Sequence, residues 1–90
     1  MKLLLCLNCA DVVRMSGQVR HCLCGRSSGR YLDDGSTVEQ TRGSLSIALH
    51  NHELSDAISV FNHNPNEWHP LLVFRAFLNP LSEPDVVYLD

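Results

Sequence analysis

The clearest pattern of hydrophobic and polar positions lies in the second half of the chain. Polar and apolar residues alternate over residues 44–49, which is the period of a half-buried strand with its aliphatic side chains on the buried face. Apolar residues then recur at the spacing of an amphipathic helix, at Leu54, Ala57, Ile58 and Phe61. Asn51 is the expected N-cap, and Asn and Pro within residues 62–65 end the helix.

Two further strands are predicted toward the C-terminus. Residues 71–78 lie between Pro70 and Pro80 and are apolar apart from Arg75, so they form either a buried strand or two helical turns. The short length of this run and its two phenylalanines favour the strand. Residues 85–89 form the last strand, after a turn that contains two prolines.

Short strands and tight turns are predicted for the first half. The strands fall at residues 2–5, 11–15, 18–21 and 30–32. Ser16 and Gly17 mark a hairpin turn that pairs the second strand with the third, and residues 35–43 form a connector because they lack apolar periodicity. The whole pattern predicts an α+β fold in a single domain, residues 1–90. An N-terminal β lobe (1–34) is followed by a small β-α-β-β body (44–90).

Composition and charge narrow the classes of protein. Ninety residues suffice for one domain, and 44% hydrophobic with 19% charged residues is globular usage, which excludes a disordered tail, a coiled coil or a multidomain enzyme. The net charge of −3 is unevenly spread. Residues 1–42 carry six basic and four acidic residues (+2), and residues 43–90 carry one and six (−5). An overall basic nucleic-acid binder is therefore disfavoured.

The N-terminal sequence favours a cytoplasmic protein. The apolar run that begins at Leu3 ends at Asn8, which is shorter than the core of an export signal, and no window approaches the ~18 apolar residues of a membrane span. No membrane partner is expected. Because the cytoplasm keeps thiols reduced, four clustered cysteines are better explained as metal ligands than as disulfides.

The cysteines form two close pairs, Cys6–Cys9 and Cys22–Cys24, separated by twelve residues. A tetrahedral ion needs two such pairs presented from two turns, and the shorter second pair requires a sharp turn. Free thiols, a redox pair and disulfides are the alternatives on spacing alone.

With Gly25 after the second pair, residues 3–32 resemble a zinc ribbon, although Leu7 and Ala10 depart from its common CPxCG pattern. The resemblance makes the N-terminal lobe zinc-ribbon-like and implies one structural Zn²⁺ held by Cys6, Cys9, Cys22 and Cys24, with His21 as the alternative donor in the second pair. Four-thiolate coordination also suits iron, and zinc is preferred. A closed site of this kind stabilises a fold and has no open position for catalysis.

Basic residues surround these cysteines in the sequence, at Arg14, Arg20, Arg26 and Arg30. One interpretation is an anion-binding loop formed by Arg26, Ser27, Ser28 and Arg30. The alternative is charge compensation around a dianionic metal centre together with a solvated loop.

The second half offers two further candidates. His50, His52, His63 and His69 form a second metal site if the fold gathers them, and are otherwise surface or hydrogen-bonded histidines. Trp68 and Leu72 are candidates for contact with a partner, because buried aromatic anchors dominate many interfaces. Their alternative role is in the core.

Together these features favour a non-catalytic zinc-binding protein that interacts with another protein, as an adaptor does. Self-association is a further expectation, because a small domain with open strand edges readily pairs with a second copy. The first alternative is a nucleic-acid-binding ribbon that uses the four arginines. The second is a small metal-dependent hydrolase or nuclease that uses the histidines.

Overall fold

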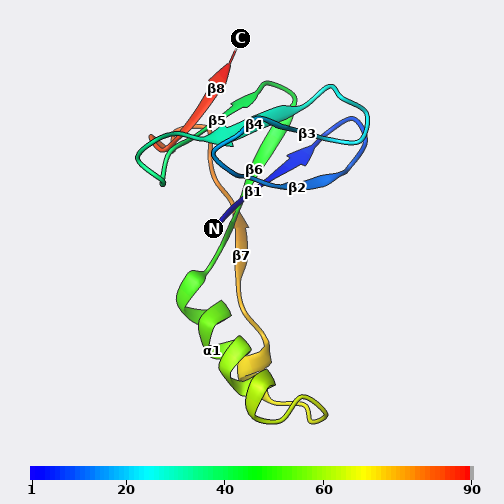
Figure 1. Cartoon of the computed structure of the whole chain (residues 1–90), viewed down its shortest axis with the longest axis vertical. Coiled ribbons are helices and arrows are strands. Elements are labelled where there is room, and N and C mark those ends of the chain that lie inside the picture. The colour runs from blue at the N-terminus through cyan, green and yellow to red at the C-terminus, as the bar shows by residue number, and fades with distance from the viewer. Residues whose placement is uncertain (90) are drawn as a thin grey trace.

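Two four-stranded β-sheets make up most of the computed structural model, which describes residues 1–89 (Figure 1). The first sheet has the strand order β2 (Val12–Arg14), β1 (Lys2–Cys6), β6 (Ser44–Leu49) and β7 (Ala76–Leu78). The second has the order β3 (Arg20–His21), β4 (Ser28–Tyr31), β5 (Val38–Thr41) and β8 (Val86–Leu89). Strands β5 and β8 are parallel, and all other paired neighbours are antiparallel.

The hydrophobic core lies between these sheets. Leu4 of β1 and Val38 of β5 are both fully buried, so the centre of each sheet contributes to it. The other buried members of the cluster are Cys6, Val13, Met15, Cys22 and Val86. Two of these are cysteines, so the metal-ligand candidates and the core are continuous.

Strand β6 confirms the predicted span of residues 44–49 but turns the opposite face inward. Ser44 and Ser46 are 2% and 0% exposed, whereas the aliphatic side chains that alternate with them are only half-buried. The buried hydroxyls have partners, because Gln40 Nε2 donates to Ser44 Oγ (2.8 Å) and Asn79 Nδ2 donates to Ser46 Oγ (3.0 Å). The expectation of an aliphatic buried face was therefore wrong, since hydrogen bonds stabilise a polar one.

Two other sequence predictions need correction. Residues 35–43 are more than a connector, because they contain β5, an interior strand whose buried positions are Val38 and Gln40. The strand predicted at residues 18–21 is reduced to β3, which pairs with β4 and not with β2. The hairpin expected around Ser16 and Gly17 is thus a crossing between the two sheets.

The N-terminal lobe (1–34) and the body (44–90) were predicted as successive parts, but each contributes strands to both sheets. Strand β6 pairs with β1, and β8 pairs with β5, so residues from the C-terminal half complete sheets that the N-terminal half begins. The mixed α and β content agrees with the predicted class. A ribbon lobe with a sheet of its own is not present in residues 1–89.

The predicted helix is α1 (Asn51–His63), and its N-cap is His50 where Asn51 was expected. His50 Nδ1 accepts a hydrogen bond from the Glu53 backbone amide (3.2 Å), which satisfies one of the free amides of the first turn. The apolar run at residues 71–78 forms neither the buried strand nor the two helical turns considered for it, because β7 covers only its last three residues and all three are exposed. A short 3-10 helix, η1 (Pro70–Leu72), precedes strand β7.

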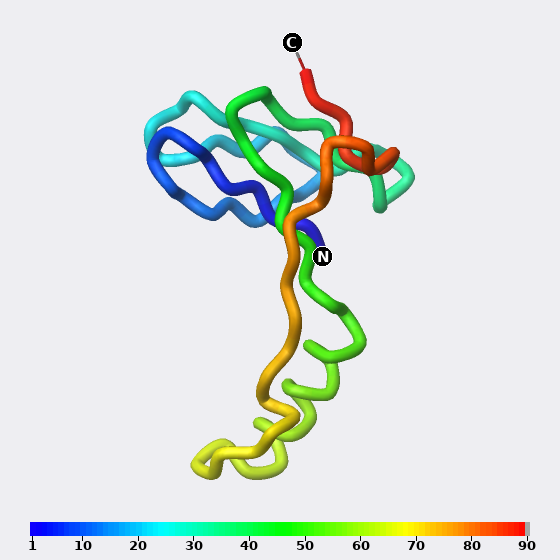
Figure 2. Tube along the Cα trace, turned by 180° about the vertical axis from the view of Figure 1, so that it is seen from behind, coloured from blue at the N-terminus to red at the C-terminus, as the bar shows by residue number. Residues whose placement is uncertain are grey.

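Residues 50–75, here called the arm, project from the sheets, here called the head (Figures 1 and 2). The molecule is accordingly elongated, with extents of 45 × 27 × 23 Å. Helix α1 packs mainly on η1, and Ala57 is its one buried residue. The large apolar side chains of the arm that are exposed are Ile58, Phe61, Trp68, Leu71, Val73 and Phe74.

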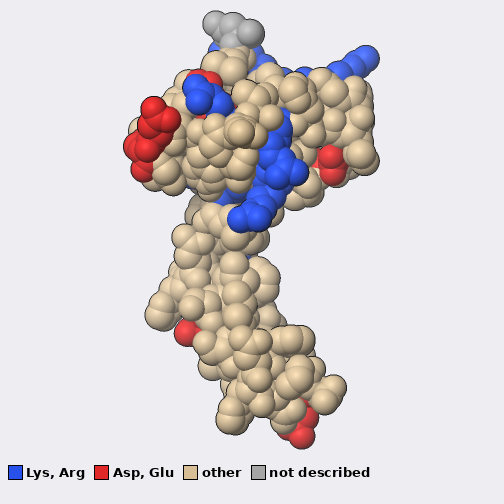
Figure 3. Space-filling model, in the orientation of Figure 1, with Lys and Arg blue, Asp and Glu red and all other residues tan. Residues whose placement is uncertain are grey.

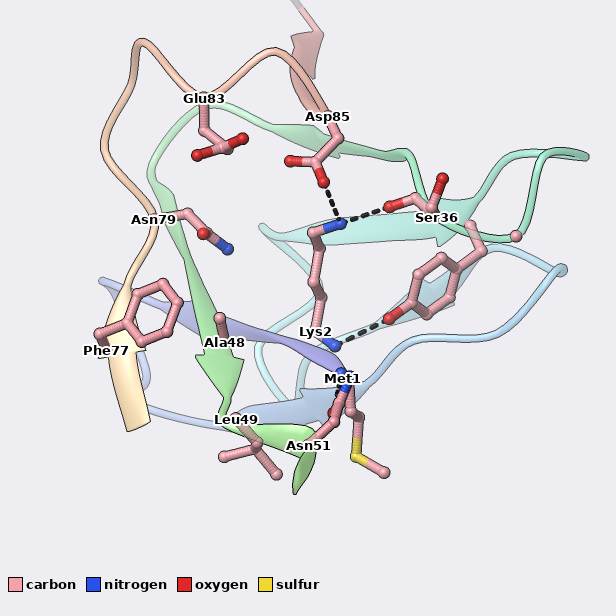
Figure 4. Close-up of a pocket in the computed structure, with 12 residues that line it drawn as sticks. Met1, Lys2, Ser36, Ala48, Leu49, Asn51, Phe77, Asn79, Glu83 and Asp85 are labelled. Atoms are coloured by element: carbon pink, nitrogen blue, oxygen red, sulfur yellow. Dashed lines mark hydrogen bonds and ion pairs between the residues drawn. The ribbon is translucent and has the colours of Figure 1, made fainter. Parts of the chain in front are cut away.

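Lys2 joins the two sheets at the end of the head nearest the arm (Figure 4). Its Nζ donates to Asp85 Oδ2 (2.8 Å) and to the Ser36 carbonyl, and its backbone amide donates to Tyr31 Oη (2.7 Å). These groups line a cavity of about 380 Å³. Lys2 therefore connects β1 to the segments that flank β5 and β8.

No helix in the described residues has the length and apolarity that a membrane crossing requires.

Candidate metal centre

The first cysteine pair lies on a tight turn at the end of β1. The Ala10 amide donates to the Cys6 carbonyl (2.9 Å), and the Cys6 amide donates to the Asp11 carbonyl (3.0 Å), which closes the turn around Cys9. Ala10 has a φ of 61°, in the left-handed region that favours glycine. The backbone therefore adopts the turn for which the zinc-ribbon pattern would place glycine, although this chain has alanine there.

The second pair lies on the turn after β3. The Gly25 amide donates to the Cys22 carbonyl (3.1 Å), and Gly25 has a φ of 77°. This is the sharp turn that a pair separated by one residue requires. Asp11 connects the two turns, because its Oδ2 accepts a hydrogen bond from the Leu23 amide (2.9 Å).

The four sulfur atoms form one cluster, and all of them lie within 4.8 Å of one another. Cys22 Sγ and Cys24 Sγ are 3.5 Å apart, and Cys6 Sγ and Cys24 Sγ are 3.8 Å apart. Tetrahedral coordination with Zn–S bonds of ~2.3 Å places sulfurs ~3.8 Å apart, whereas a disulfide needs ~2.05 Å. The spacing fits ligands of one ion, and all four cysteines are free thiols.

Hydrogen bonds prepare two of these thiols for ionisation. The Ser27 side chain, followed by backbone amides at Cys9 and Asn8, lowers the pKa of Cys6 from 9.0 to about 6. The Arg26 backbone amide, with the Asn8 side chain, lowers the pKa of Cys24. The Ser27 amide also donates to Cys22 Sγ (3.3 Å). Donors around a sulfur stabilise the thiolate, which is the form that binds metal.

Cys9 behaves differently. Backbone amides at Asp11 and Cys24 lower its pKa, but burial and hydrogen bonds with the Cys6 and Cys24 side chains outweigh them and raise it. Several thiolates at contact distance repel one another, so a cation at their centre is required before all can ionise.

The donor set determines what the centre can do. Four thiolates are soft ligands that suit zinc or iron, and a closed tetrahedron of them holds an ion without leaving a position for substrate. Cys6 and Cys22 are buried in the core, Cys9 is half-buried and Cys24 is exposed. The centre therefore joins β1 to the β3–β4 connection and meets solvent on one side.

Of the four residues expected to bind an anion, Arg26 and Ser27 line one groove, and Ser28 and Arg30 do not line it. Ser27 is 2% exposed and lies beside Cys6, the Ser28 amide donates to Thr41 Oγ1 (3.0 Å), and Arg30 Nε pairs with Glu39 (2.9 Å). Arg14 and Arg20 are exposed on β2 and β3. Arg26 lines a groove of about 540 Å³ beside the cysteine cluster, with Arg42 as its other basic residue.

The four histidines considered for a second metal site do not come together in the described residues. His50 Nδ1 caps α1, and His69 Nδ1 accepts from the Leu71 amide (3.0 Å) at the start of η1. His52 Nε2 lies 3.6 Å from Asp56 one turn along α1. Within residues 1–89, the four cysteines are the group of three or more His, Cys, Asp or Glu donors close enough to share an ion, and His21 is outside it.

Trp68 and Leu72 lie on the arm but in different surroundings. Trp68 is 73% exposed and lines a hollow of about 180 Å³ at the tip. Leu72 is half-buried on η1 and lines an apolar groove along α1. The core role considered for Trp68 does not agree with its exposure.

Sequence reasoning missed Asp11 and Ser27 as supports of the centre. Asp11 acts on Leu23, twelve residues away, and the Ser27 hydroxyl acts on Cys6, so no local spacing indicates either role.

Comparisons with protein-family models, with curated proteins and with solved structures find no match. The assignment of the centre therefore rests on its own geometry.

Proposed function

We propose that this protein is a non-catalytic zinc-binding interaction protein of the cytoplasm, in which Zn²⁺ fixes the shape of the head and the arm tip binds a protein partner. The observation that carries the proposal is the cluster of Cys6, Cys9, Cys22 and Cys24, whose sulfur atoms all lie within 4.8 Å. A reducing compartment suits a centre that depends on thiolates.

Two features support a structural role for the metal. All four ligands come from the protein, so the ion is left with no position for water or substrate. The cysteines Cys6 and Cys22 are also part of the core. In a head with so few large buried side chains, the free energy of metal binding contributes a large part of the folding free energy.

The partner surface is proposed at the tip of the arm. Trp68 is exposed there beside His63, Asn64, Glu67 and His69, in the hollow of about 180 Å³. Tryptophan is enriched among the residues that dominate binding free energy, because it offers a large rigid surface and one hydrogen-bond donor.

The metal is tested by elemental analysis and native mass spectrometry of protein purified under reducing conditions without chelator. We expect one zinc ion per chain and no visible absorbance of the kind that four-thiolate iron gives. Cys9→Ser should lose the metal, and Leu23→Ser should keep it, because Leu23 lies between two ligands but is 88% exposed. Metal-free wild-type protein would contradict the proposal.

The partner surface is tested by affinity capture with Trp68→Ala. We expect loss of the captured protein, with affinity reduced ~30-fold or more, if Trp68 is an interface anchor. Leu81→Ala is the matched control, since Leu81 is 78% exposed but belongs to the head. Equal capture by both variants would exclude the arm tip as the binding surface.

A further inference from the structure

Cys24 differs from the other three cysteines of the cluster in its exposure to solvent. Cys6 and Cys22 are buried in the core and Cys9 is half-buried, whereas Cys24 is exposed. Solutes in the surrounding water therefore meet Cys24 before they meet the others. Because the susceptibility of a thiolate to oxidation follows its accessibility, the cluster has one preferred point of attack.

Cys24 also has another cysteine at contact distance on its own turn. Its Sγ lies 3.5 Å from Cys22 Sγ, and the distance to Cys6 Sγ is 3.8 Å. The hydrogen bond from the Gly25 amide to the Cys22 carbonyl (3.1 Å) closes the turn that carries Cys22 and Cys24. A disulfide between these two closes a loop within that one turn, whereas a disulfide to Cys6 would have to join two turns. Cys22 is therefore the thiol best placed to react with an oxidised Cys24.

The sulfur atoms are the groups of this centre that can be oxidised, because Zn²⁺ does not change its oxidation state. Metal-bound cysteines are thiolates, and the thiolate is the nucleophilic form of cysteine. Arg26 lines the groove beside the cluster, and Figure 3 shows lysine and arginine atoms gathered over the head and not over the arm. Positive charge near a thiolate that attacks a peroxide stabilises the hydroxide that leaves.

We propose that Cys24 is the site at which hydrogen peroxide oxidises this protein, and that a disulfide between Cys24 and Cys22 then forms and releases the metal. The oxidation site rests on the zinc centre proposed above, and it adds a form of regulation to the structural role of that centre.

The reaction balances in two steps. The Cys24 thiolate attacks one oxygen of hydrogen peroxide, the O–O bond breaks and hydroxide leaves, so that Cys24 becomes a sulfenic acid. The Cys22 thiolate then attacks the Cys24 sulfur, the S–O bond breaks and a second hydroxide leaves as the disulfide forms. The two thiolates together lose one electron pair, and the peroxide accepts that pair to become two hydroxide ions.

A disulfide between two of the four ligands ends tetrahedral coordination. Cys6 and Cys9 remain as thiols, and two ligands hold zinc far more weakly than four. Cys6 and Cys22 also belong to the core, so the head loosens when the ion is lost. Oxidation of one exposed cysteine is thereby converted into a change in the packing of the sheets.

Trypsin separates the two cysteine pairs, because it cuts after lysine and arginine. Residues 21–26 form a peptide that contains Cys22 and Cys24, and residues 3–14 form a peptide that contains the other two cysteines. The zinc-loaded protein is treated with hydrogen peroxide, sampled when half of its zinc is free, alkylated with iodoacetamide and digested. We expect the fraction of peptide 21–26 that carries an internal disulfide to equal the fraction of zinc released. Peptide 3–14 should be alkylated on both cysteines.

Two variants test whether the exposed sulfur sets the rate. Cys24→His keeps four donors of the kinds that zinc accepts, so it should bind zinc and release it roughly 10-fold or more slowly in peroxide. Leu23→Ser is the matched control, since Leu23 is 88% exposed on the same turn, and it should release zinc at the wild-type rate. Peptide mapping of the wild type decides the proposal if Cys24→His takes up no zinc.

Each contrary result has a separate meaning. Zinc that stays bound in excess peroxide would overturn the proposal and leave the zinc centre intact. A disulfide that links peptide 21–26 to peptide 3–14 would overturn the assignment of Cys22 as the reacting partner. Equal release rates in Cys24→His and wild type would overturn Cys24 as the point of attack. Wild-type protein isolated without metal would overturn the zinc centre and the oxidation site together.

Discussion

The head and the arm of this protein differ in whether they contain a buried hydrophobic core. The head buries Leu4 and Val38 completely between its sheets and adds a cluster of four cysteines to that core. In the arm, Ala57 is the one buried residue of a 13-residue helix, and the aromatic residues Phe61, Trp68 and Phe74 are 53%, 73% and 39% exposed. The comparison indicates that most of the packing that stabilises the fold lies in the head.

Removal of the metal should have the largest effect, and it should act on the head. A chelator, or Cys9→Ser, removes the cation that allows the clustered thiols to ionise together, and metal binding of this kind contributes on the order of 10 kcal/mol in small zinc domains. That is comparable with the whole stability of a small domain. We expect hydrogen-exchange protection to disappear from β1, β4, β5 and β6.

Two controls belong to this experiment. Zinc added back should restore the protection, and magnesium should not, because thiolates are poor ligands for a hard cation. If the amides of the head kept their hydrogen-exchange protection after treatment with chelator, the sheets would be shown to fold without the metal.

Truncation of the core should have the second largest effect. Leu4→Ala should cost ~3 kcal/mol, because Leu4 is 0% exposed and its removal leaves a cavity between the sheets. Leu71→Ala on the arm should cost less than ~1 kcal/mol, because Leu71 is already 50% exposed. Urea unfolding of the zinc-loaded proteins measures both. Equal losses of unfolding free energy in Leu4→Ala and Leu71→Ala would contradict the difference in packing between the head and the arm.

Gly29 tests how tightly β4 packs against its neighbour β5 and against the Met15 side chain. A Cβ at this position would lie 2.5 Å from Met15 Cε and 2.8 Å from the Glu39 carbonyl oxygen, so Gly29→Ala should cost ~2 kcal/mol. Gly17→Ala is the control, since nothing lies within 4 Å of its added Cβ. A urea midpoint unchanged in Gly29→Ala would contradict the close packing of β4 on β5 and Met15.

Local pattern was sufficient for some elements of the fold. Residues 44–49 and the helix were recognised because each carries its own periodicity, and residues 2–5 because they are a short apolar run. Strand β5 was missed because its buried positions alternate Val38 with Gln40, and Gln40 is stabilised inside only by partners such as Ser44. Pairing of β8 with β5 joins segments almost fifty residues apart, and no local signal specifies it.

The candidate site shows the same division. The four cysteines were found by spacing, because a ligand pair is a local feature of one turn. Asp11 and Ser27 were not, because each acts on the opposite turn across the fold. Ala10 was predicted only in part. The sequence shows that it occupies the glycine position of the zinc-ribbon pattern, but its φ of 61° is known only from the structure.

Ala10→Gly should therefore stabilise the protein. Alanine at positive φ carries a steric cost of about 1 kcal/mol that glycine avoids, so we expect a gain of that size in urea unfolding. Gly25→Ala is the reciprocal variant, because Gly25 has a φ of 77° and open space around it, and it should lose a similar amount. Zinc content should be unchanged in both, and a loss of stability in Ala10→Gly would contradict the strained turn.

The smallest effect is expected where Lys2 meets Asp85 at the boundary of the two regions. The hydrogen bond from Lys2, and then its charge, lowers the pKa of Asp85 below its ordinary 3.8. A carboxylate with a lowered pKa stabilises the fold above the unfolded pKa of ~3.9, and the contribution disappears as pH falls through the folded pKa. Asp85→Asn should cost less than ~1 kcal/mol at pH 7, because this side chain is 39% exposed and screened by solvent.

Salt and pH separate this contribution from the metal centre, which also responds to acid. The difference between Asp85→Asn and wild type should stay constant from pH 7 to pH 5, shrink below about pH 4, and fall in ~1 M salt, where exposed charges are screened. Asp33→Asn, at an exposed position in the neighbouring turn, should differ from wild type by no more than a few tenths of a kcal/mol. If the difference in unfolding free energy between Asp85→Asn and wild type depended on neither salt nor pH, Asp85 would stabilise β8 by packing. The ion pair with Lys2 would then contribute nothing to the stability of the head.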